Sequence, residues 1–159
     1  MYDKCVALLA QRGVTLEDIA DCVLYLQSHH HPEILKAEIV ETVKTVVNKR
    51  EVQHAIMTGI ALDMMAEKEG CMDPELADIM RKDYSLYGID EVMAYGICNL
   101  YGSIALTNYG YIDREKPGIL AKLNEHSAQV NCFLDDIVGA IAASAASKLA
   151  HHHAEEEKI

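Results

Sequence analysis

The sequence predicts an all-α protein, a single-domain bundle of about six to eight helices with buried central helices. Three observations support this fold class. The 159 residues include only 3 prolines and 9 glycines. Apolar residues recur at spacings of three and four, which is the period of a helix face, and no segment shows the sustained alternation of a half-buried strand. We expect one domain over residues 1–150 and a disordered tail over residues 151–159.

The amino-terminal half carries start and stop signals for five helices. Thr15 can cap the second helix, with Asp18 at the matching position of a capping box. Pro32 suits the first turn of the third helix, and Asp73 can cap the fifth. Glycines follow the first and fourth helices, where a left-handed cap residue is favourable. The expected ranges are about 3–11, 15–26, 32–47, 52–69 and 74–82.

The central stretch Val92–Ile112 contains 21 residues without one charged side chain. Such a run is expected to be buried. Its length would satisfy a membrane span, but Asn99, Asn108 and three glycines make insertion into lipid unfavourable. We therefore interpret the run as the buried centre of a soluble helical domain.

The carboxy-terminal part predicts one or two helical turns over Gly118–Asn124 and a last helix from about Asn131 to Ala150. Residues 139–146 of that helix are almost all glycine, alanine or serine. Small side chains allow neighbouring helices to approach closely, so we expect this helix near the middle of the bundle.

Composition excludes several classes of function. With 25 acidic and 14 basic residues the net charge is -11, which repels nucleic acid and anionic membranes. A phosphate substrate would therefore need metal ions. The five cysteines are widely spaced and never form Cys-x-x-Cys, so we expect small core residues and not disulfides or thiolate metal sites. No secretion signal is recognisable, which predicts a cytoplasmic protein. A helical domain of this size is also compatible with a homo-oligomer.

Acidic residues border the apolar stretches at three places. These are Asp90 with Glu91, Asp113, and the adjacent Asp135 and Asp136. Clustered carboxylate oxygens are the ligands that Mg²⁺ requires, and a bound divalent ion can activate water beside a phosphate. An alternative interpretation of the last pair is that one aspartate favours the helix dipole and the other is solvated.

A single straight helix over the uncharged run would separate Asp90 from Asp113 by about 34 Å. A shared metal site therefore requires the chain to reverse, and Asn99–Ser103, which contains Gly102, is the expected place. Further upstream, Asp63 lies between Leu62 and Met64. A structural hydrogen-bonding role and a catalytic role are both open for it.

Three elements in this order resemble the phosphatidylglycerophosphatase A family. They are the Asp90-Glu91 pair, the element Asp113-x-x-Lys116-Pro117, and the run from Asp135 to Ala140. The strings Asn-Tyr-Gly-Tyr-Ile-Asp at 108–113 and Lys-Pro-Gly-Ile-Leu at 116–120 resemble its soluble bacillar branch. The resemblance covers about residues 88–146.

The resemblance implies a phosphomonoester hydrolase that depends on Mg²⁺ or another divalent cation. Its substrate would be phosphatidylglycerophosphate or a related soluble phosphate ester. The implied metal ligands are Asp90, Asp113, Asp135 and Asp136. The implied catalytic residues are Glu91, Lys116, which would contact the phosphate, and Asp136.

Two other functions are compatible with a carboxylate-rich helical chain. All-helical nucleotide pyrophosphohydrolases carry the motif Glu-Glu-x-x-Glu followed by Glu-x-x-Asp. In this chain the adjacent glutamates lie at 155–157. A non-catalytic helical module that binds a partner would keep the carboxylates as a hydrogen-bond network.

Overall fold

The computed structural model describes residues 1–28, 30 and 32–156. This part of the chain forms nine α-helices and no strand, which confirms the all-α prediction. In chain order the helices are α1 (Tyr2–Gln11), α2 (Leu16–Gln27), α3 (Lys36–Val47), α4 (Arg50–Ala66), α5 (Pro74–Lys82), α6 (Ile89–Cys98), α7 (Ser103–Glu115), α8 (Ile119–Leu123) and α9 (Leu134–Glu156).

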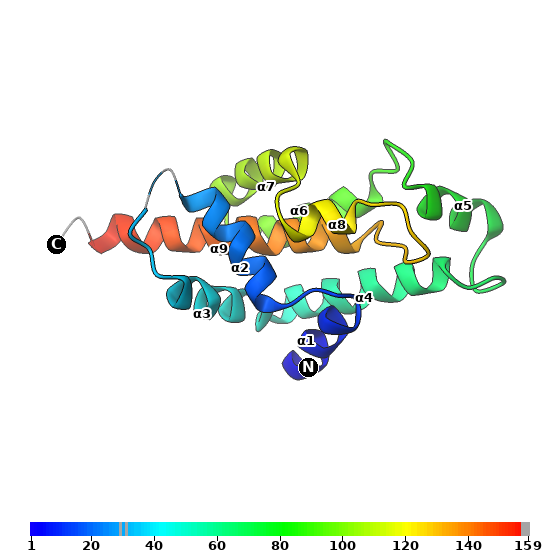
Figure 1. The fold of residues 1–159 in the computed structure, drawn as a ribbon, viewed down its shortest axis with the longest axis horizontal. Helices are drawn as coiled ribbons and strands as arrows, with labels where there is room; N and C mark the ends of the chain where they lie inside the picture. The colour runs from blue at the N-terminus through cyan, green and yellow to red at the C-terminus, as the bar shows by residue number, and fades with distance from the viewer. Residues whose placement is uncertain (29, 31, 157–159) are drawn as a thin grey trace.

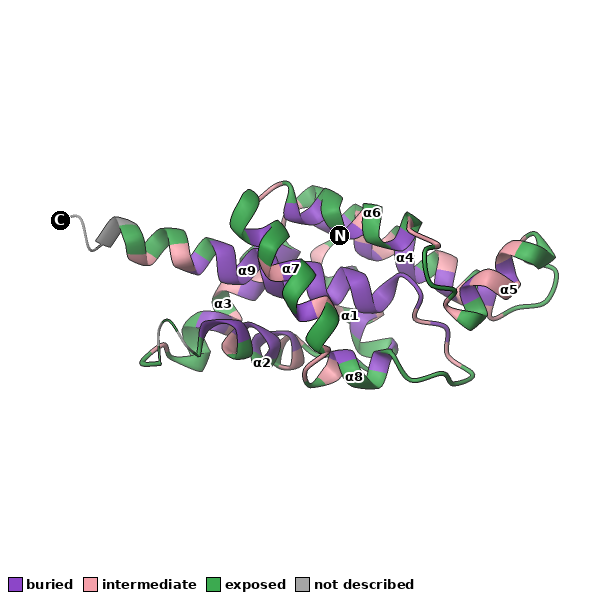
Figure 2. Ribbon diagram, turned by 90° about the horizontal axis from the view of Figure 1, so that it is seen from above, coloured by how far each residue is buried: buried purple, intermediate pink, exposed green. Residues whose placement is uncertain are grey.

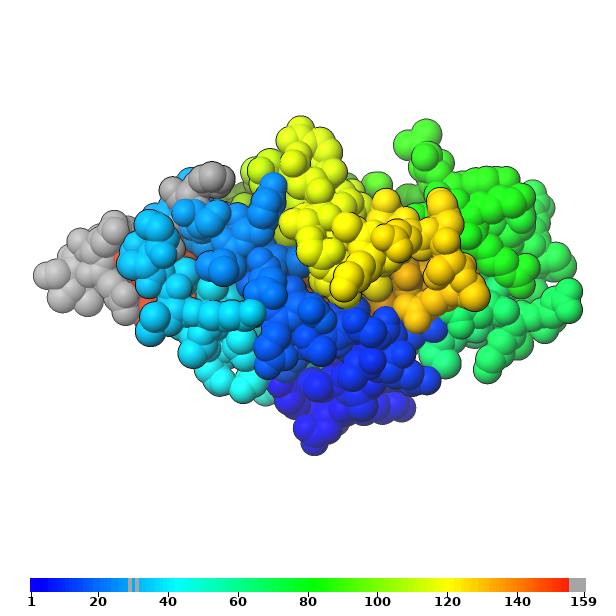
Figure 3. Space-filling view, viewed as in Figure 1, coloured from blue at the N-terminus to red at the C-terminus, as the bar shows by residue number. Residues whose placement is uncertain are grey.

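Helix α9 runs along the long axis of the molecule, and most of the other helices are arranged around it (Figure 1). It packs against α2, α3, α4, α6, α7 and α8. In the space-filling view the segments that include α2, α7 and α8 cover its middle (Figure 3). The prediction that the small-residue helix lies in the middle of the bundle is therefore confirmed.

Small side chains set the distance between α9 and its neighbours. Ala140, Ala142, Ala143 and Ala146 of α9 have no exposed surface. On α4, Gly59 lies against the first turns of α9, and a Cβ atom there would collide with Ile137. Close packing of this kind is sensitive to single added carbon atoms.

The uncharged run is divided into two helices, as a shared acidic site requires. Helix α6 ends at Cys98, and α7 begins after Gly102, whose φ of 89° lies in the left-handed region that glycine adopts readily. Both helices pack against α9 and against each other. The reversal therefore falls within Asn99–Ser103, where we expected it.

The prediction that the whole run is buried is wrong. Helices α6 and α7 each bury one face on α9 and expose the other, as the alternating colours along the helices show in Figure 2. Val92 is 62% exposed and Tyr95 is 44% exposed. The absence of charged residues does not determine which side of a helix faces the core. The run therefore combines buried apolar positions with an exposed uncharged face.

The helix boundaries that differ most from the prediction are the start of α3 and the end of α9. Helix α3 begins at Lys36 and not at Pro32, because Leu35 before it has an extended backbone and Pro32 takes part in a turn. Helix α9 continues six residues past Ala150 to Glu156, so residues 151–156 of the expected disordered tail are helical. Residues 157–159 lie outside the described residues. Alanine and glutamate favour helix in this extension.

The cysteines are free thiols, in agreement with the prediction that they form no disulfides. Four are buried, but Cys71 is exposed in the connection between α4 and α5, so it is not a core residue.

Candidate active site

A polar cavity of about 150 Å³ opens at the amino ends of α6 and α9. Six acidic side chains and one lysine contribute to its wall, together with the loop between α5 and α6. The lining residues are Asp83, Tyr84, Ser85, Leu86, Tyr87, Gly88, Asp90, Glu91, Asp113, Lys116, Asn124, Asp135 and Asp136.

Every residue that the sequence predicted as a metal ligand or catalytic group lines this cavity. They are Asp90, Glu91, Asp113, Lys116, Asp135 and Asp136. The break between α6 and α7 makes this possible, because α7 returns along α9 and brings its last turn back to the start of α9.

Asp135 and Asp136 lie in the first turn of α9, and both are 5% exposed. Asp136 accepts a hydrogen bond from the Tyr109 hydroxyl at 2.8 Å. Asp135 accepts one from the Asp136 backbone N–H at 2.9 Å and pairs with Lys116. The alternative in which one aspartate is solvated is therefore wrong. Both side chains face the cavity because they stand at the very beginning of the helix.

Burial dominates the electrostatics of this pair. Burial, followed by the charge of Asp135, raises the pKa of Asp136 well above that of an ordinary aspartate. Burial also raises the pKa of Asp135, against the lowering effect of Lys116. Both groups thus sit where a negative charge is unfavourable unless additional positive charge is close.

Lys116 directly follows α7, and its side chain contacts two of the acidic centres. Its ammonium lies 2.5 Å from an Asp113 carboxylate oxygen and 2.8 Å from one of Asp135. Burial tends to lower the pKa of Lys116, but the neighbouring Asp135 and Asp113 raise it, so the side chain remains a cation.

The acidic residues separate into two groups that could each hold a metal ion. In the first, one oxygen each from Asp113, Asp135 and Asp136 lie within 4.8 Å of one another. In the second, Asp90 is combined with Asp83 and Cys132 in the same way. The four residues predicted as ligands of one or two metal ions are thus divided between the groups, with Asp90 apart from the other three.

The second group is less suited to magnesium. The Cys132 thiol donates to Asp90 at 3.7 Å. Burial, followed by the charge of Asp90, raises the pKa of Cys132, so the sulfur remains protonated. Magnesium prefers oxygen ligands. The group of Asp113, Asp135 and Asp136 is therefore the better oxygen site.

Sequence reasoning missed Asp83 and Tyr109. Asp83 follows the last residue of α5 with a φ of 48°, and its carboxyl reaches the cavity from outside the matched motifs. Tyr109 stands four residues before Asp113, which places both on one side of α7. That spacing could have identified Tyr109 as a neighbour of the site, whereas no motif or spacing in the sequence pointed to Asp83.

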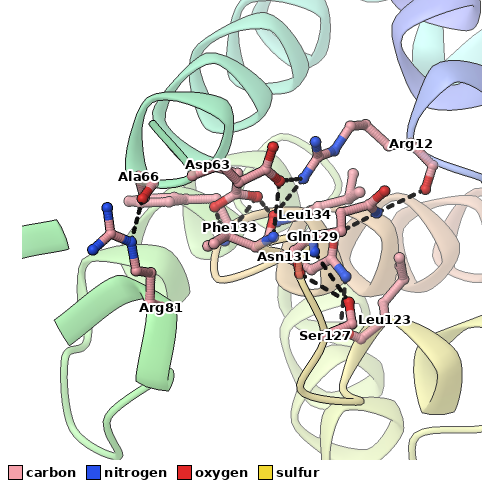
Figure 4. A network of polar contacts seen from close by, with 12 residues as sticks. Arg12, Asp63, Ala66, Arg81, Leu123, Ser127, Gln129, Asn131, Phe133 and Leu134 are labelled. Atoms are coloured by element: carbon pink, nitrogen blue, oxygen red, sulfur yellow. Dashed lines mark hydrogen bonds and ion pairs between the residues drawn. The ribbon is translucent and has the colours of Figure 1, made fainter. Parts of the chain in front are cut away.

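Asp63 does not line the cavity. It is fully buried and accepts hydrogen bonds from the backbone N–H groups of Phe133 and Leu134, each at 3.0 Å (Figure 4). These donors stand at the start of α9, where no carbonyl of the helix itself can accept them. Of the two roles left open by the sequence, the geometry gives Asp63 the structural one.

A polar network around Asp63 fixes the segment that precedes α9. Arg12, which directly follows α1, donates to the Val130 carbonyl at 2.6 Å and pairs with Glu67. Glu67 accepts from the Val130 N–H at 2.8 Å, and Gln129 donates to the Arg12 carbonyl (Figure 4). Residues at the carboxy-terminal ends of α1 and α4 thus hold the loop that places Asp135 and Asp136.

The buried carboxyl groups predict an unusual pH dependence of stability. Burial raises the pKa of Asp63 to about 8, against the lowering effect of the Phe133 and Leu134 N–H groups. The folded protein then binds more protons than the unfolded chain between about pH 4 and pH 8. We expect the free energy of unfolding to fall as the pH rises through this range. Urea denaturation without divalent cations at pH 5, 6, 7 and 8 measures it, and a rise would contradict the expectation.

The chain resembles known proteins over nearly its whole length. The model of the family "Phosphatidylglycerophosphatase A" matches residues 6–151, which include all of the acidic groups described above. The chain belongs to the phosphatidylglycerophosphatase A family. The match extends well upstream of residues 88–146, where the motifs resemble the family.

Within the phosphatidylglycerophosphatase A family the chain is similar to proteins of Bacillus subtilis and Listeria monocytogenes. It is 52% identical over 152 residues to the uncharacterized protein YutG of Bacillus subtilis, covering 95% of this chain and 91% of YutG. A crystal structure of the low temperature requirement C protein from Listeria monocytogenes superposes with a TM-score of 0.92 at 54% identity, covering 96% of both chains. The structure of YpjQ from Bacillus subtilis gives 0.92 at 45% identity, covering 97% of this chain and 95% of YpjQ.

Among the described residues, no helix is both long enough and apolar enough to cross a membrane. The uncharged run falls on the two helices α6 and α7.

Proposed function

We propose that the protein is a phosphomonoester hydrolase that depends on a divalent cation. The observation that carries the proposal is the convergence of Asp113, Asp135 and Asp136 oxygens within 4.8 Å in the wall of a polar cavity. Membership of the phosphatidylglycerophosphatase A family supports a phosphate-ester substrate.

The donor set fits a hard divalent cation. Its three side chains are carboxylates, and two of them are 5% exposed. Lys116 is the one basic residue among the lining residues, and it faces six acidic side chains. A divalent ion would supply the positive charge that the buried pair lacks, with Asp113, Asp135 and Asp136 as its ligands. When bound, such an ion polarises a phosphate oxygen and lowers the pKa of a coordinated water.

The remaining residues of the cavity can be given roles in hydrolysis. Glu91 is exposed at the cavity wall, where its carboxylate can orient a water molecule and accept its proton. The water oxygen bonds to phosphorus and the ester P–O bond breaks. The leaving alkoxide takes a proton from solvent, and Glu91 releases the proton it accepted to solvent, so the step balances as one water consumed. Lys116 is the side chain that can contact the phosphate through its ammonium. The products are inorganic phosphate and an alcohol.

The substrate in this proposal is phosphatidylglycerophosphate or a related soluble phosphate ester. A screen of lipid and soluble phosphomonoesters, with and without millimolar Mg²⁺ or Mn²⁺, tests it by measuring released inorganic phosphate. We expect release from at least one ester only when the cation is present. Release of pyrophosphate from nucleoside triphosphates would favour a pyrophosphohydrolase instead. No release from any compound would favour the non-catalytic helical module.

A further inference from the structure

Lys116 is placed where a metal ion would also bind. It stands at the end of α7 in the left-handed conformation, with a φ of 47°. Its ammonium contacts oxygens of Asp113 and Asp135, which are two of the three residues in the carboxylate group. The side chain is only 21% exposed. Lys116 therefore already neutralises part of the charge that a divalent cation would neutralise.

The two cations compete for the same carboxylates. If a divalent ion bound one of these carboxylates while the lysine ammonium kept its contact, the two cations would lie within a few Å of each other. At such distances like charges repel strongly in a partly buried site. Coordination of the divalent ion by both Asp113 and Asp135 is therefore more favourable once the ammonium has moved away from them.

The cavity beside Lys116 can accept its ammonium group. Lys116 itself lines the cavity of about 150 Å³, and Asn124 contributes to the same wall. The lysine side chain is a flexible stem of four carbon atoms with a charge at its end. Rotation about its bonds can carry the ammonium from the carboxylates into the cavity without moving α7.

We propose that Lys116 leaves Asp113 and Asp135 when a divalent cation binds them and turns into the cavity, where it becomes available to the phosphate of the substrate. This inference rests on the metal site of the proposed function. It assigns an order to binding, with the cation first and the phosphate second. Before the cation binds, the ammonium is held by two carboxylates and the remaining acids repel an anion.

Chemical labelling of lysine tests this exchange in the intact protein. The rate at which an acetylating reagent modifies Lys116 is measured by mass spectrometry, with and without saturating Mg²⁺ at constant ionic strength and pH. We expect the rate at Lys116 to rise about fivefold or more with Mg²⁺, because the ammonium loses two ion pairs. Lys122, which is exposed on α8, is the matched control and should change by less than about twofold.

Calorimetric titration with MgCl₂ separates the two proposals. Binding with no rise, or with a fall, in the labelling of Lys116 overturns the exchange and leaves the metal site intact. If no Mg²⁺ or Mn²⁺ binds, the metal site of the proposed function fails and the exchange fails with it.

Two further results bear on the exchange. Lys116→Met removes the competing charge, so it should bind Mg²⁺ about tenfold more tightly, whereas Lys122→Met should not; unchanged affinity in Lys116→Met would contradict the competition. Adding inorganic phosphate should slow the labelling of Lys116 only when Mg²⁺ is present. Equal slowing without Mg²⁺ would overturn the proposed order.

Discussion

Replacing Asp136 with asparagine is expected to reduce cation-stimulated phosphate release by about a thousandfold or more while the protein stays folded. Asparagine has nearly the shape of aspartate and can still accept the hydrogen bond that Tyr109 donates at 2.8 Å. Its neutral amide oxygen binds a divalent cation more weakly than a carboxylate does. Initial rates of phosphate release, with circular dichroism melting of the same sample, measure both effects.

The fold should tolerate this change because the native carboxylate is in an unfavourable place. Burial and the neighbouring Asp135 raise the pKa of Asp136, so the folded protein already disfavours its charged form and loses little when a neutral asparagine replaces it. The melting temperature without divalent cations should therefore stay the same or increase. Asp21→Asn is the matched control, because Asp21 is exposed on α2, pairs with Lys36 and lies outside the cavity. Full activity in Asp136→Asn would remove Asp136 from the site.

The helical core and the reversal of the chain could be predicted from local sequence signals. Capping and periodicity identified most helices, and Thr15 and Asp18 form the expected capping box. Glycine at position 102, read together with the distance between Asp90 and Asp113, located the break between α6 and α7. These are properties of neighbouring residues or of chain geometry, so no knowledge of tertiary packing was needed.

The grouping of the acidic residues could not be predicted in the same way. Asp90 and Cys132 are 42 residues apart, and only the packing of α6 beside α9 brings them together. Asp83 reaches the cavity from the end of α5, which carries none of the motifs that resemble the family. The exposed face of α6 and α7 was missed for a related reason, since composition reports how apolar a segment is and not which side meets the core.

Replacing Asp63 with alanine is expected to lower the free energy of unfolding by about 3 kcal/mol. The change leaves the N–H groups of Phe133 and Leu134 without the acceptor that now lies 3.0 Å from each, in a place that water does not reach. Urea denaturation measures the loss. Asp73→Ala is the matched control, because Asp73 accepts from the N–H groups of Glu75 and Leu76 at the start of α5 but is exposed. There water can replace the lost acceptor, and the expected cost is about 1 kcal/mol.

The same substitution distinguishes a structural from a catalytic role for Asp63. Phe133 and Leu134 immediately precede Asp135 and Asp136, so loosening them displaces the carboxylates without removing one. Asp63→Ala should therefore weaken cation binding while leaving measurable phosphate release at high cation concentration. Asp136→Asn should stay far less active at the same cation concentrations, because it has lost one of the three carboxylate ligands. Equal losses of stability in Asp63→Ala and Asp73→Ala would contradict the buried capping role, because burial is the property that separates the two aspartates.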